Sequence, residues 1–369
     1  MNLIDRHIIV RYLSNFVLLL GLLFVFAISI DVVVQFDKFS DAAHEMAERE
    51  GRSYPVMLVF AVLDFHGPRI FQFFAFMTGL VGIGAAGFTL VQMYRTRELV
   101  AIMAAGVPLH RVVAAILVAQ FGLVVLQLLD QEFVLPRLAS RLVRDHKSIL
   151  EPGIENFEVA LMRDGGGSLM YAASLDPRSK RAESILILER DETGTTSGRI
   201  SAEAGVWDEA REGWILEGGR RMGAISDENL QADRVSVDFW STDLSPRMLL
   251  ARRSLNFAQM LSLSQLRDLQ EQGRTGDDRI ERTIFARFSG ALVNILVPAI
   301  VLPFFLLRSP SSGMLLQSLR AALVSIPLLI GSVAAMTVAL PGLPPGVGAF
   351  LPVALLLPIA VARLAYLKT

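Results

Sequence analysis

Few residues in this chain have the types and spacing that catalysis requires, and its clearest chemical pattern is basic. Arg137, Arg141 and Arg144 follow one another at i, i+4 and i+7, so they share one face of a helix. Guanidinium groups bind phosphate oxygens through paired hydrogen bonds. We therefore predict phosphate contacts at these arginines, with Lys38 and Arg282 as further candidates beside long apolar runs. The alternative is ordinary anchoring of basic side chains at a membrane surface.

Motifs of the common enzyme classes are absent from the sequence. It contains no phosphate-binding loop ending in Gly-Lys-Ser or Gly-Lys-Thr, no His-Glu-x-x-His motif and no Gly-x-Ser-x-Gly turn. The five histidines are scattered and there is no cysteine, which excludes disulfides and thiolate metal sites. We expect no catalytic residue, no metal and no cofactor bound by this chain, so any ATP hydrolysis must come from another protein.

The apolar residues, 53% of the chain, are concentrated in two blocks. The uncharged runs are Leu13–Ile30, Ile70–Tyr94 and Val112–Leu129 in the first block, and Phe288–Leu307 and Ala321–Ala362 in the second. A turn at Pro341-Gly342-Leu343-Pro344-Pro345 divides the last run into two. Since about 18 to 20 apolar residues cross a bilayer as a helix, the pattern predicts a membrane protein with six helical spans in a three-plus-three arrangement. We expect the first span to remain uncleaved.

The stretch between the blocks has the composition of a water-soluble domain. Short strand-forming runs alternate in it with turn clusters such as Asp164-Gly165-Gly166-Gly167. We predict strands at Phe157–Met162, Ser168–Ala173, Ser184–Glu189, Arg199–Trp207, Gly213–Glu217, Arg221–Ile225 and Val235–Trp240, followed by a helix at Ser262–Gln272. The spacing predicts an antiparallel, jelly-roll-like domain. Trp207 and Trp214 should meet across a turn, as core or rim residues or, alternatively, as a stacking surface for a ligand.

These patterns predict three segments: residues 1–135 with spans one to three, 136–280 with the β domain and its linkers, and 281–369 with spans four to six. Orientation follows from the charges of the short loops. The side that holds both termini is basic, whereas the loop from Asp37 to His66 is rich in Asp and Glu. Because positively charged loops stay in the cytoplasm, we expect cytoplasmic termini and a periplasmic β domain.

A short segment between spans two and three has the features of a docking helix. In the stretch from 95 to 107, Leu99, Ile102 and Met103 fall on one helical face, Glu98 occupies the first turn, and Gly106 stops the helix. Such a helix can lie on the membrane or dock in the groove of a partner. The alternative is a plain connector in which Glu98 is solvated.

Several segments, in order along nearly the whole chain, resemble the lipopolysaccharide-export permease family (LptF/LptG). The run from Glu98 to Gly106 is similar to the family's coupling helix, and the start of the chain is slightly more similar to the G-type subunit. The other similar segments are Arg199–Trp207 with Gly213–Gly219, Asp243–Arg247, Leu261–Leu266, Leu302–Phe305 with Arg308, and Gly342–Pro345. The acidic loop 39–59 and the segment Arg137–Lys147 depart from the family's pattern.

This resemblance implies a subunit of an ABC transporter in the bacterial inner membrane. Such a subunit works with a paralogous permease, a cytoplasmic ATPase dimer that uses the ATP, and a periplasmic bridge protein with a related β-jellyroll. Together they extract lipopolysaccharide, or a related anionic glycolipid, from the membrane. By the same resemblance, the coupling helix with Arg97, Glu98, Leu99, Ile102, Met103 and Gly106 would dock on the ATPase, and the first and fifth spans, Leu13–Ile30 and Ala321–Leu340, would border the lipid's gates.

Two other classes remain open at the level of sequence. A receptor or envelope-assembly scaffold with six spans would need no ATPase-docking helix and would transport nothing. An intramembrane enzyme would need polar residues within its spans, and Gln120, Gln127, Ser289 and Asn294 are among the few available. Hydrogen bonding between helices explains these four more simply.

Overall fold

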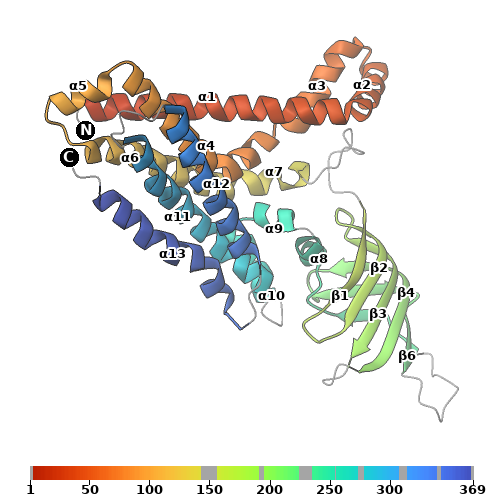
Figure 1. Cartoon of the computed structure of the whole chain (residues 1–369). Coiled ribbons are helices and arrows are strands. Elements are labelled where there is room, and N and C mark those ends of the chain that lie inside the picture. The colour runs from red at the N-terminus through yellow and green to blue at the C-terminus, as the bar shows by residue number, and fades with distance from the viewer. Residues whose placement is uncertain are drawn as a thin grey trace. The chain divides into compact units, whose positions relative to one another are not determined.

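The computed structural model describes residues 3–142, 156–190, 195–223, 235–253, 255–272, 278–306, 314–338 and 342–366. The chain divides into two compact units, one made of residues 1–135 and 282–369 and the other of residues 136–281. The first is the helical unit and the second is the β unit (Figure 1).

Six helices of the described chain are long and apolar enough to cross a membrane. They are α1 (Leu3–Val34), α4 (Arg69–Arg95), α6 (Leu109–Leu129), α11 (Asp278–Leu306), α12 (Met314–Thr337) and α13 (Pro345–Ala365). All six spans predicted from the apolar runs are therefore present. The helices extend beyond the runs at several ends, since a helix continues through polar residues that lie outside the hydrocarbon core.

Span three continues beyond its apolar run. After α6, the chain passes through one turn of π-helix, η1 (Asp130–Val134), into α7 (Leu135–Leu142). A π turn widens the helix locally, so the residues that follow it face a different direction than a regular α-helix would give them. The sequence pattern gives no sign of this turn.

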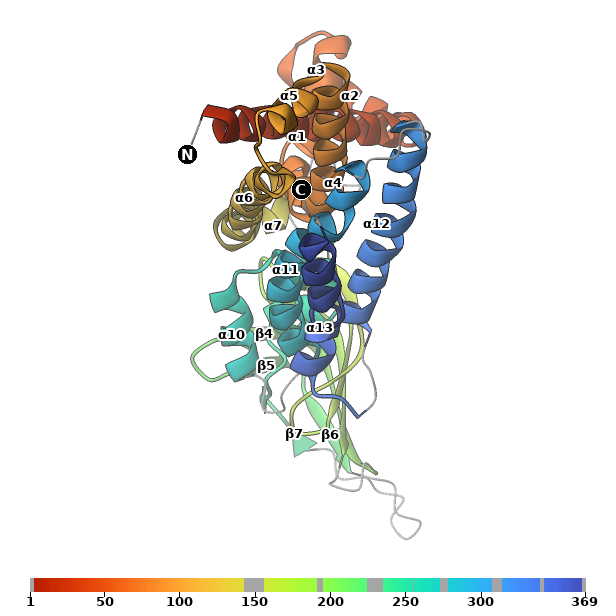
Figure 2. The same cartoon turned by 60° about the vertical axis from the view of Figure 1, so that its left-hand side comes forward.

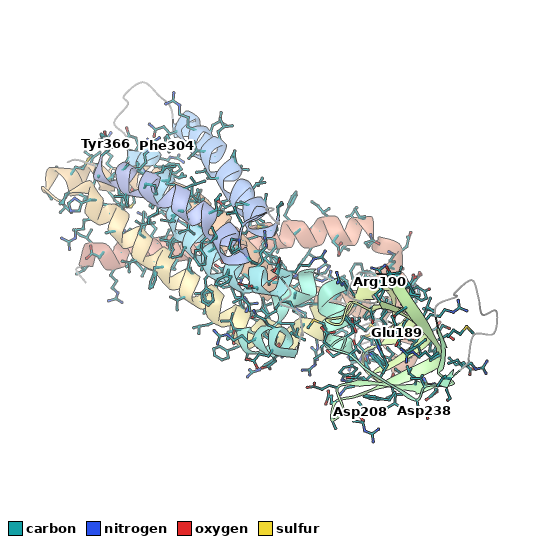
Figure 3. The ribbon with its side chains drawn as sticks, turned by 90° about the horizontal axis from the view of Figure 1, so that it is seen from below. Glu189, Arg190, Asp208, Asp238, Phe304 and Tyr366 are labelled. Carbon is teal, nitrogen blue, oxygen red and sulfur yellow. The ribbon has the colours of Figure 1, made fainter. Side chains whose placement is uncertain are left out.

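The helical unit packs around two apolar clusters. One joins Ile8, Tyr12 and Phe16 of α1 to residues of α4 and α6. The other is formed mainly by α11, α12 and α13, which lie beside one another in Figure 2. Near the end of α13, the guanidinium carbon of Arg363 lies 4.8 Å from the ring centroid of Phe304 on α11, and Figure 3 places Phe304 and Tyr366 at the same end of these helices.

The segment predicted as an acidic loop after span one is helical instead. It forms α2 (Phe36–Glu50) and α3 (Tyr54–His66), joined by a turn at Gly51, where φ is +66°. At 13 residues, α3 is too short to cross a bilayer, for which about 20 are needed. The apolar helix α3 is therefore not one of the six spans.

In the described part of the β unit, eight strands form one antiparallel sheet. They are β1 (Phe157–Arg163), β2 (Leu169–Asp176), β3 (Arg181–Arg190), β4 (Thr196–Asp208), β5 (Gly213–Glu217), β6 (Arg220–Gly223), β7 (Val235–Ser236) and β8 (Phe239–Ser241). The main order is β1-β2-β3-β4-β5-β8, and β6 pairs with both β4 and β7. In Figure 3, Glu189 and Arg190 mark the end of β3.

The strand predictions are confirmed within the described residues except at one place, and the last two residues of the predicted strand Arg221–Ile225 lie outside them. The run Val235–Trp240 was expected as a single strand, but it forms β7 and β8, which pair with different partners, β6 and β5. The predicted helix at 262–272 is α10 (Leu263–Gln272), and two more short helices, α8 (Pro246–Arg253) and α9 (Leu255–Met260), precede it.

One line of tryptophans crosses three neighbouring strands of this sheet. Trp207 on β4 pairs with Trp214 on β5, and Trp214 pairs with Trp240 on β8. The rings of Trp207 and Trp214 meet edge to face, with centroids 5.6 Å apart, as predicted from the sequence. Trp214 is fully buried, and its Nε1 donates a hydrogen bond to the carbonyl oxygen of Leu244. Trp214 and Trp240 belong to the core of the sheet, and the partly buried Trp207 lies at its rim.

Candidate functional site

The segment with the strongest sequence indication of function is α5 (Glu98–Ala104), which connects spans two and three. The turn before it depends on Arg97, whose φ of 59° lies in the left-handed region. Gly106 has a φ of +75°, a conformation that glycine adopts readily, and this ends the segment. Figure 1 shows α5 at the same end of the helical unit as the start of α1 and the end of α13.

The apolar face of α5 points into the protein. Leu99 is buried, and Ile102 and Met103 pack against the cluster that contains Ile8 and Tyr12. The opposite face, which carries Val100, Ala101, Ala104, Ala105 and Gly106, is exposed. The three apolar residues predicted as docking contacts thus attach α5 to its own protein, and the surface left for a partner is built from small side chains.

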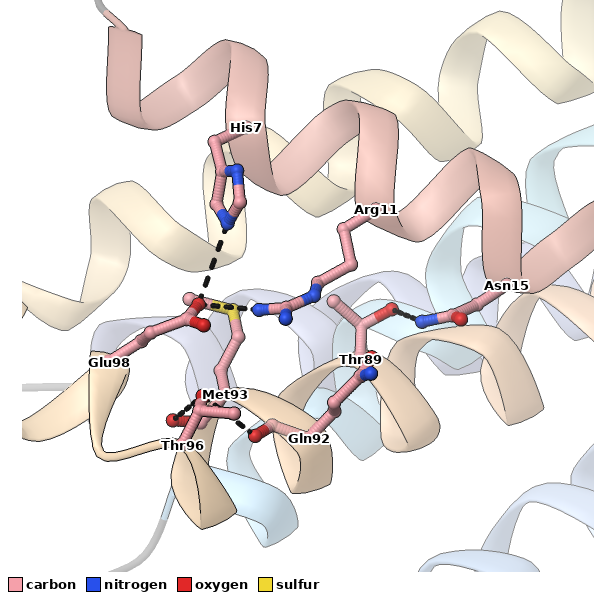
Figure 4. Close-up of polar contacts among 8 residues, drawn as sticks. All are labelled: His7, Arg11, Asn15, Thr89, Gln92, Met93, Thr96 and Glu98. Atoms are coloured by element: carbon pink, nitrogen blue, oxygen red, sulfur yellow. Dashed lines mark hydrogen bonds and ion pairs between the residues drawn. The ribbon is translucent and has the colours of Figure 1, made fainter.

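Glu98 is engaged by α1. Its Oε2 lies 2.5 Å from Nη1 of Arg11 and 3.5 Å from Nε2 of His7 (Figure 4). Partial burial by itself raises the pKa of Glu98. Hydrogen bonds from Arg11 and Thr96 and the charge of Arg11 outweigh burial, so the pKa is lowered below the ordinary value of a glutamate. Glu98 is therefore a carboxylate at neutral pH, and it ties the start of α5 to span one.

Further polar contacts fix the first half of α1. Asp5 accepts two hydrogen bonds from Arg111 at the start of α6, at 3.0 and 3.2 Å. Asn15 donates a hydrogen bond of 2.8 Å to Thr89 on α4, also visible in Figure 4. Different residues join α1 to α4, α5 and α6. We therefore expect α5 and the first half of α1 to move together as one rigid group.

A second polar group lies deep between the spans. Tyr12 donates a 2.5 Å hydrogen bond to Oε1 of Gln120, whose Nε2 donates to the carbonyl oxygen of Asn294. The Asn294 side chain donates to Gln127, which in turn donates to the carbonyl oxygen of Ala75. These bonds link α1, α4, α6 and α11, so Gln120, Gln127 and Asn294 join helices as the sequence suggested. Ser289, the fourth residue of that expectation, is buried, but its hydroxyl has no hydrogen-bond partner among the described residues.

Near the end of span three, charged groups are buried as well. Arg287 on α11 lies 3.7 Å from Glu132 of η1, and the arginine side chain is 5% exposed. Asp130, the first residue of the π turn, is also buried. Since charged side chains are costly in a membrane interior, such residues normally have a structural or functional partner.

The five candidate phosphate contacts have different surroundings. Lys38 is partly exposed on α2, and Arg137 and Arg141 are exposed on α7, which belongs to the β unit. Arg282 is buried and donates a hydrogen bond through Nη1 to the carbonyl oxygen of Val338. Arg144 lies outside the described residues. The exposed side chains of Arg137 and Arg141 can be reached from solvent, whereas that of Arg282 is buried.

Other kinds of site have no support in the part of the chain that the structure describes. No group of three or more His, Asp or Glu side chains gathers there in a way that could hold a metal ion. In the β unit, the neighbouring acids Asp164 and Asp243 accept hydrogen bonds from the backbone amides of Ser168 and Gly165.

Six spans, a soluble β unit and a short helix fixed against span one define a polytopic membrane protein with the architecture of a transport permease. The family model for the lipopolysaccharide export system permease LptF/LptG matches residues 6–366. The chain belongs to this family. It is thus an integral protein of the inner membrane and a transporter component rather than a catalytic enzyme. A search of curated proteins found no match.

Proposed function

We propose that this chain is one permease subunit of an ABC transporter that extracts lipopolysaccharide, or a related anionic glycolipid, from the inner membrane. The family match over nearly the whole chain carries this proposal. In the transporter, the chain pairs with a paralogous permease subunit, and its β unit passes the lipid to a periplasmic bridge protein with a related β-jellyroll.

We propose an orientation with both termini in the cytoplasm and the β unit in the periplasm. The loops at the end of the helical unit that holds α5 are basic, with Arg95, Arg97 and Arg111 close together in sequence. The α2–α3 segment at the other end of α1 is acidic, and such an asymmetry favours cytoplasmic α5.

Energy for extraction comes from a cytoplasmic ATPase dimer that docks on α5 and uses the ATP, while this chain binds no cofactor. The exposed face with Val100, Ala101 and Ala104 supports such docking, because small side chains let a groove approach the helix backbone closely. Leu99, Ile102 and Met103 contribute by holding α5 in place rather than by touching the ATPase.

Glu98 then acts as a rigid connection, or strut, between α5 and α1. Its pairing with Arg11 and His7 connects the helix that receives the ATPase's movement to α1, the span that borders the lipid's gate together with α12. A displacement of α5 therefore displaces the start of α1, without a flexible linker between the two.

Reconstitution tests the whole proposal. The chain, its paralogue and the ATPase are placed in vesicles that contain lipopolysaccharide, and release to the soluble bridge protein is measured with and without ATP. ATP-dependent release that requires this chain is expected. Unchanged release when this chain is omitted would reject the proposal.

Replacing Arg137 and Arg141 together by alanine should reduce photocrosslinking of the lipid to α7 if these arginines hold its phosphates.

A further inference from the structure

The α2–α3 segment forms a helical hairpin at the end of α1 that is distant from the N-terminus (Figure 1). The two helices pack through Phe39, Ala42 and Ala43 of α2 and Met57, Ala61 and Phe65 of α3, all buried. The rings of Phe39 and Phe65 meet edge to face at 5.5 Å. The hairpin is therefore a built element with its own small core.

Contacts with the spans fix the base of this hairpin. Nε2 of His66 lies 3.3 Å from Oδ2 of Asp31 near the end of α1. The guanidinium carbon of Arg69, at the start of α4, lies 3.7 Å from the ring centroid of Phe65. Asp31 directly follows the uncharged run Leu13–Ile30. The base of the hairpin thus lies at the level where the hydrocarbon part of span one ends.

The two outer faces of the hairpin have opposite character. On α3, one stripe at the spacing i, i+3, i+4 and i+7 is apolar and exposed, with exposed fractions of 54% for Val56, 60% for Val59, 50% for Phe60 and 62% for Leu63. On α2, the exposed stripe is acidic and comprises Asp37, Asp41, Glu45 and Glu48. One face is suited to lipid and the other to water.

The apolar stripe belongs to the lipid-facing surface of the spans. Val33 and Val34 at the end of α1 and Ile70 and Phe71 at the start of α4 are also exposed, and the hairpin connects these two ends directly. A helix of 13 residues is about 20 Å long. It cannot cross the bilayer, but an apolar helix of this length with a polar partner is suited to lie in one leaflet.

We propose that α3 is an interfacial helix whose stripe of Val56, Val59, Phe60 and Leu63 binds the acyl chains of the leaflet that the end of α1 reaches. Under the proposed orientation this is the periplasmic leaflet. The acidic stripe of α2 faces the water above it. Because the hairpin is joined to Asp31, it holds this end of span one at a fixed depth. The inference needs only the membrane spans, so it does not depend on the proposed cargo or partners.

Site-directed spin labelling tests the proposal directly, because the native chain has no cysteine and each introduced one is unique. Labels are placed one at a time at Val59→Cys, Phe60→Cys and Leu63→Cys, and at Asp41→Cys and Glu48→Cys on α2. The full chain is reconstituted in vesicles of phosphatidylethanolamine and phosphatidylglycerol. Collision rates are then measured with oxygen, which concentrates in lipid, and with a water-soluble nickel chelate.

The expected result is that labels on the two helices prefer opposite collision reagents. Labels on α3 collide mainly with oxygen, as does the lipid control Leu22→Cys on α1, whereas labels on α2 collide mainly with nickel, as does the aqueous control Ser179→Cys in the β unit. Preferential collision of the α3 labels with nickel would place the stripe in water and overturn the proposal. Protection of these labels from both reagents would overturn it too, because the stripe would then be covered by protein.

Discussion

At the scale of single residues, the ion pairs of Glu98 determine how α5 is attached to span one. Sequence reasoning left two alternatives for this carboxylate, a docking contact on a partner or a solvated side chain. The structure shows a third arrangement, in which Arg11 and His7 of span one hold it. No local pattern could reveal this, because Arg11 is 87 positions away in the sequence.

A charge exchange separates a strut from a docking contact. Glu98→Arg places two cations together and should lower ATP-dependent lipid release about fivefold or more, which is a typical size for a coupling between sites. The double variant Glu98→Arg with Arg11→Glu restores the pair and should recover most of the release. Because the pKa of Glu98 is lowered, the wild-type pair is present at neutral pH and is lost only as the pH falls below the ordinary glutamate range.

Release rates are compared at matched expression and matched ATPase content. If Glu98 instead touches the ATPase, the double variant will be as defective as the single one, and co-purification of the ATPase will fall in both.

Gly82 on α4 lies directly against the buried polar group between the spans. A Cβ atom there would lie 2.4 Å from Oε1 of Gln120, whose amide is already bonded to Tyr12 and Asn294. Gly82→Ala must displace this side chain, so we expect a loss of about 1–2 kcal/mol, as for other hydrogen bonds between membrane helices. Thermal unfolding of the full chain in detergent measures it. Gly122→Ala, whose Cβ meets nothing within 4 Å, should unfold as the wild type does.

At the scale of elements, the predictions from sequence succeed where periodicity is strong. Long apolar runs identify all six spans, and alternation with turn clusters identifies most strands. The helices α2 and α3 were missed, because an acidic helix followed by a short apolar one has the average composition of a loop. The direction that a helix face points is harder to predict from sequence than the helix itself. The apolar face of α5 was correctly recognised, but whether it points to a partner or inward depends on neighbours distant in sequence.

The exposed face of α5 gives an element-scale prediction. Ala104→Arg adds a long charged side chain where we propose close approach of the ATPase, so the ATPase should no longer co-purify with the chain. The fold should persist, because Ala104 is exposed and arginine favours helices. The matched control is Ala173→Arg, an exposed alanine on β2. Retention of the ATPase by Ala104→Arg would move the docking surface elsewhere.

In the β unit, Trp214 should dominate stability. Replacing this fully buried ring by alanine leaves a cavity and should cost about 3–5 kcal/mol. Trp214→Phe keeps most of the packing but leaves the carbonyl of Leu244 without its donor, at a cost of about 1–3 kcal/mol. Hydrogen exchange of the strands in the full chain distinguishes the two variants. Equal protection in wild type and Trp214→Ala would show that the tryptophan line is not a core.

At the scale of the whole molecule, the orientation proposed from charge is open to direct measurement. Reporter fusions within residues 95–111 should be active as cytoplasmic fusions, and fusions in the turn between β4 and β5, near Glu209, should be active only in the periplasm. The physical reason is the cost of moving basic loops across a membrane against the positive-inside rule. A β unit that scores as cytoplasmic would reverse the direction of transport that we propose.

The three tryptophans of the chain, Trp207, Trp214 and Trp240, all belong to the line across the sheet. The spans contain no tryptophan, so the helical unit contributes almost no tryptophan fluorescence. The unlabelled protein therefore carries a built-in optical probe of its soluble part alone. In a stopped-flow experiment, a change in emission after ATP addition would report an event at the sheet, such as the arrival of the lipid that we propose it passes on. Rearrangements of the spans that leave the sheet unchanged would not alter the emission.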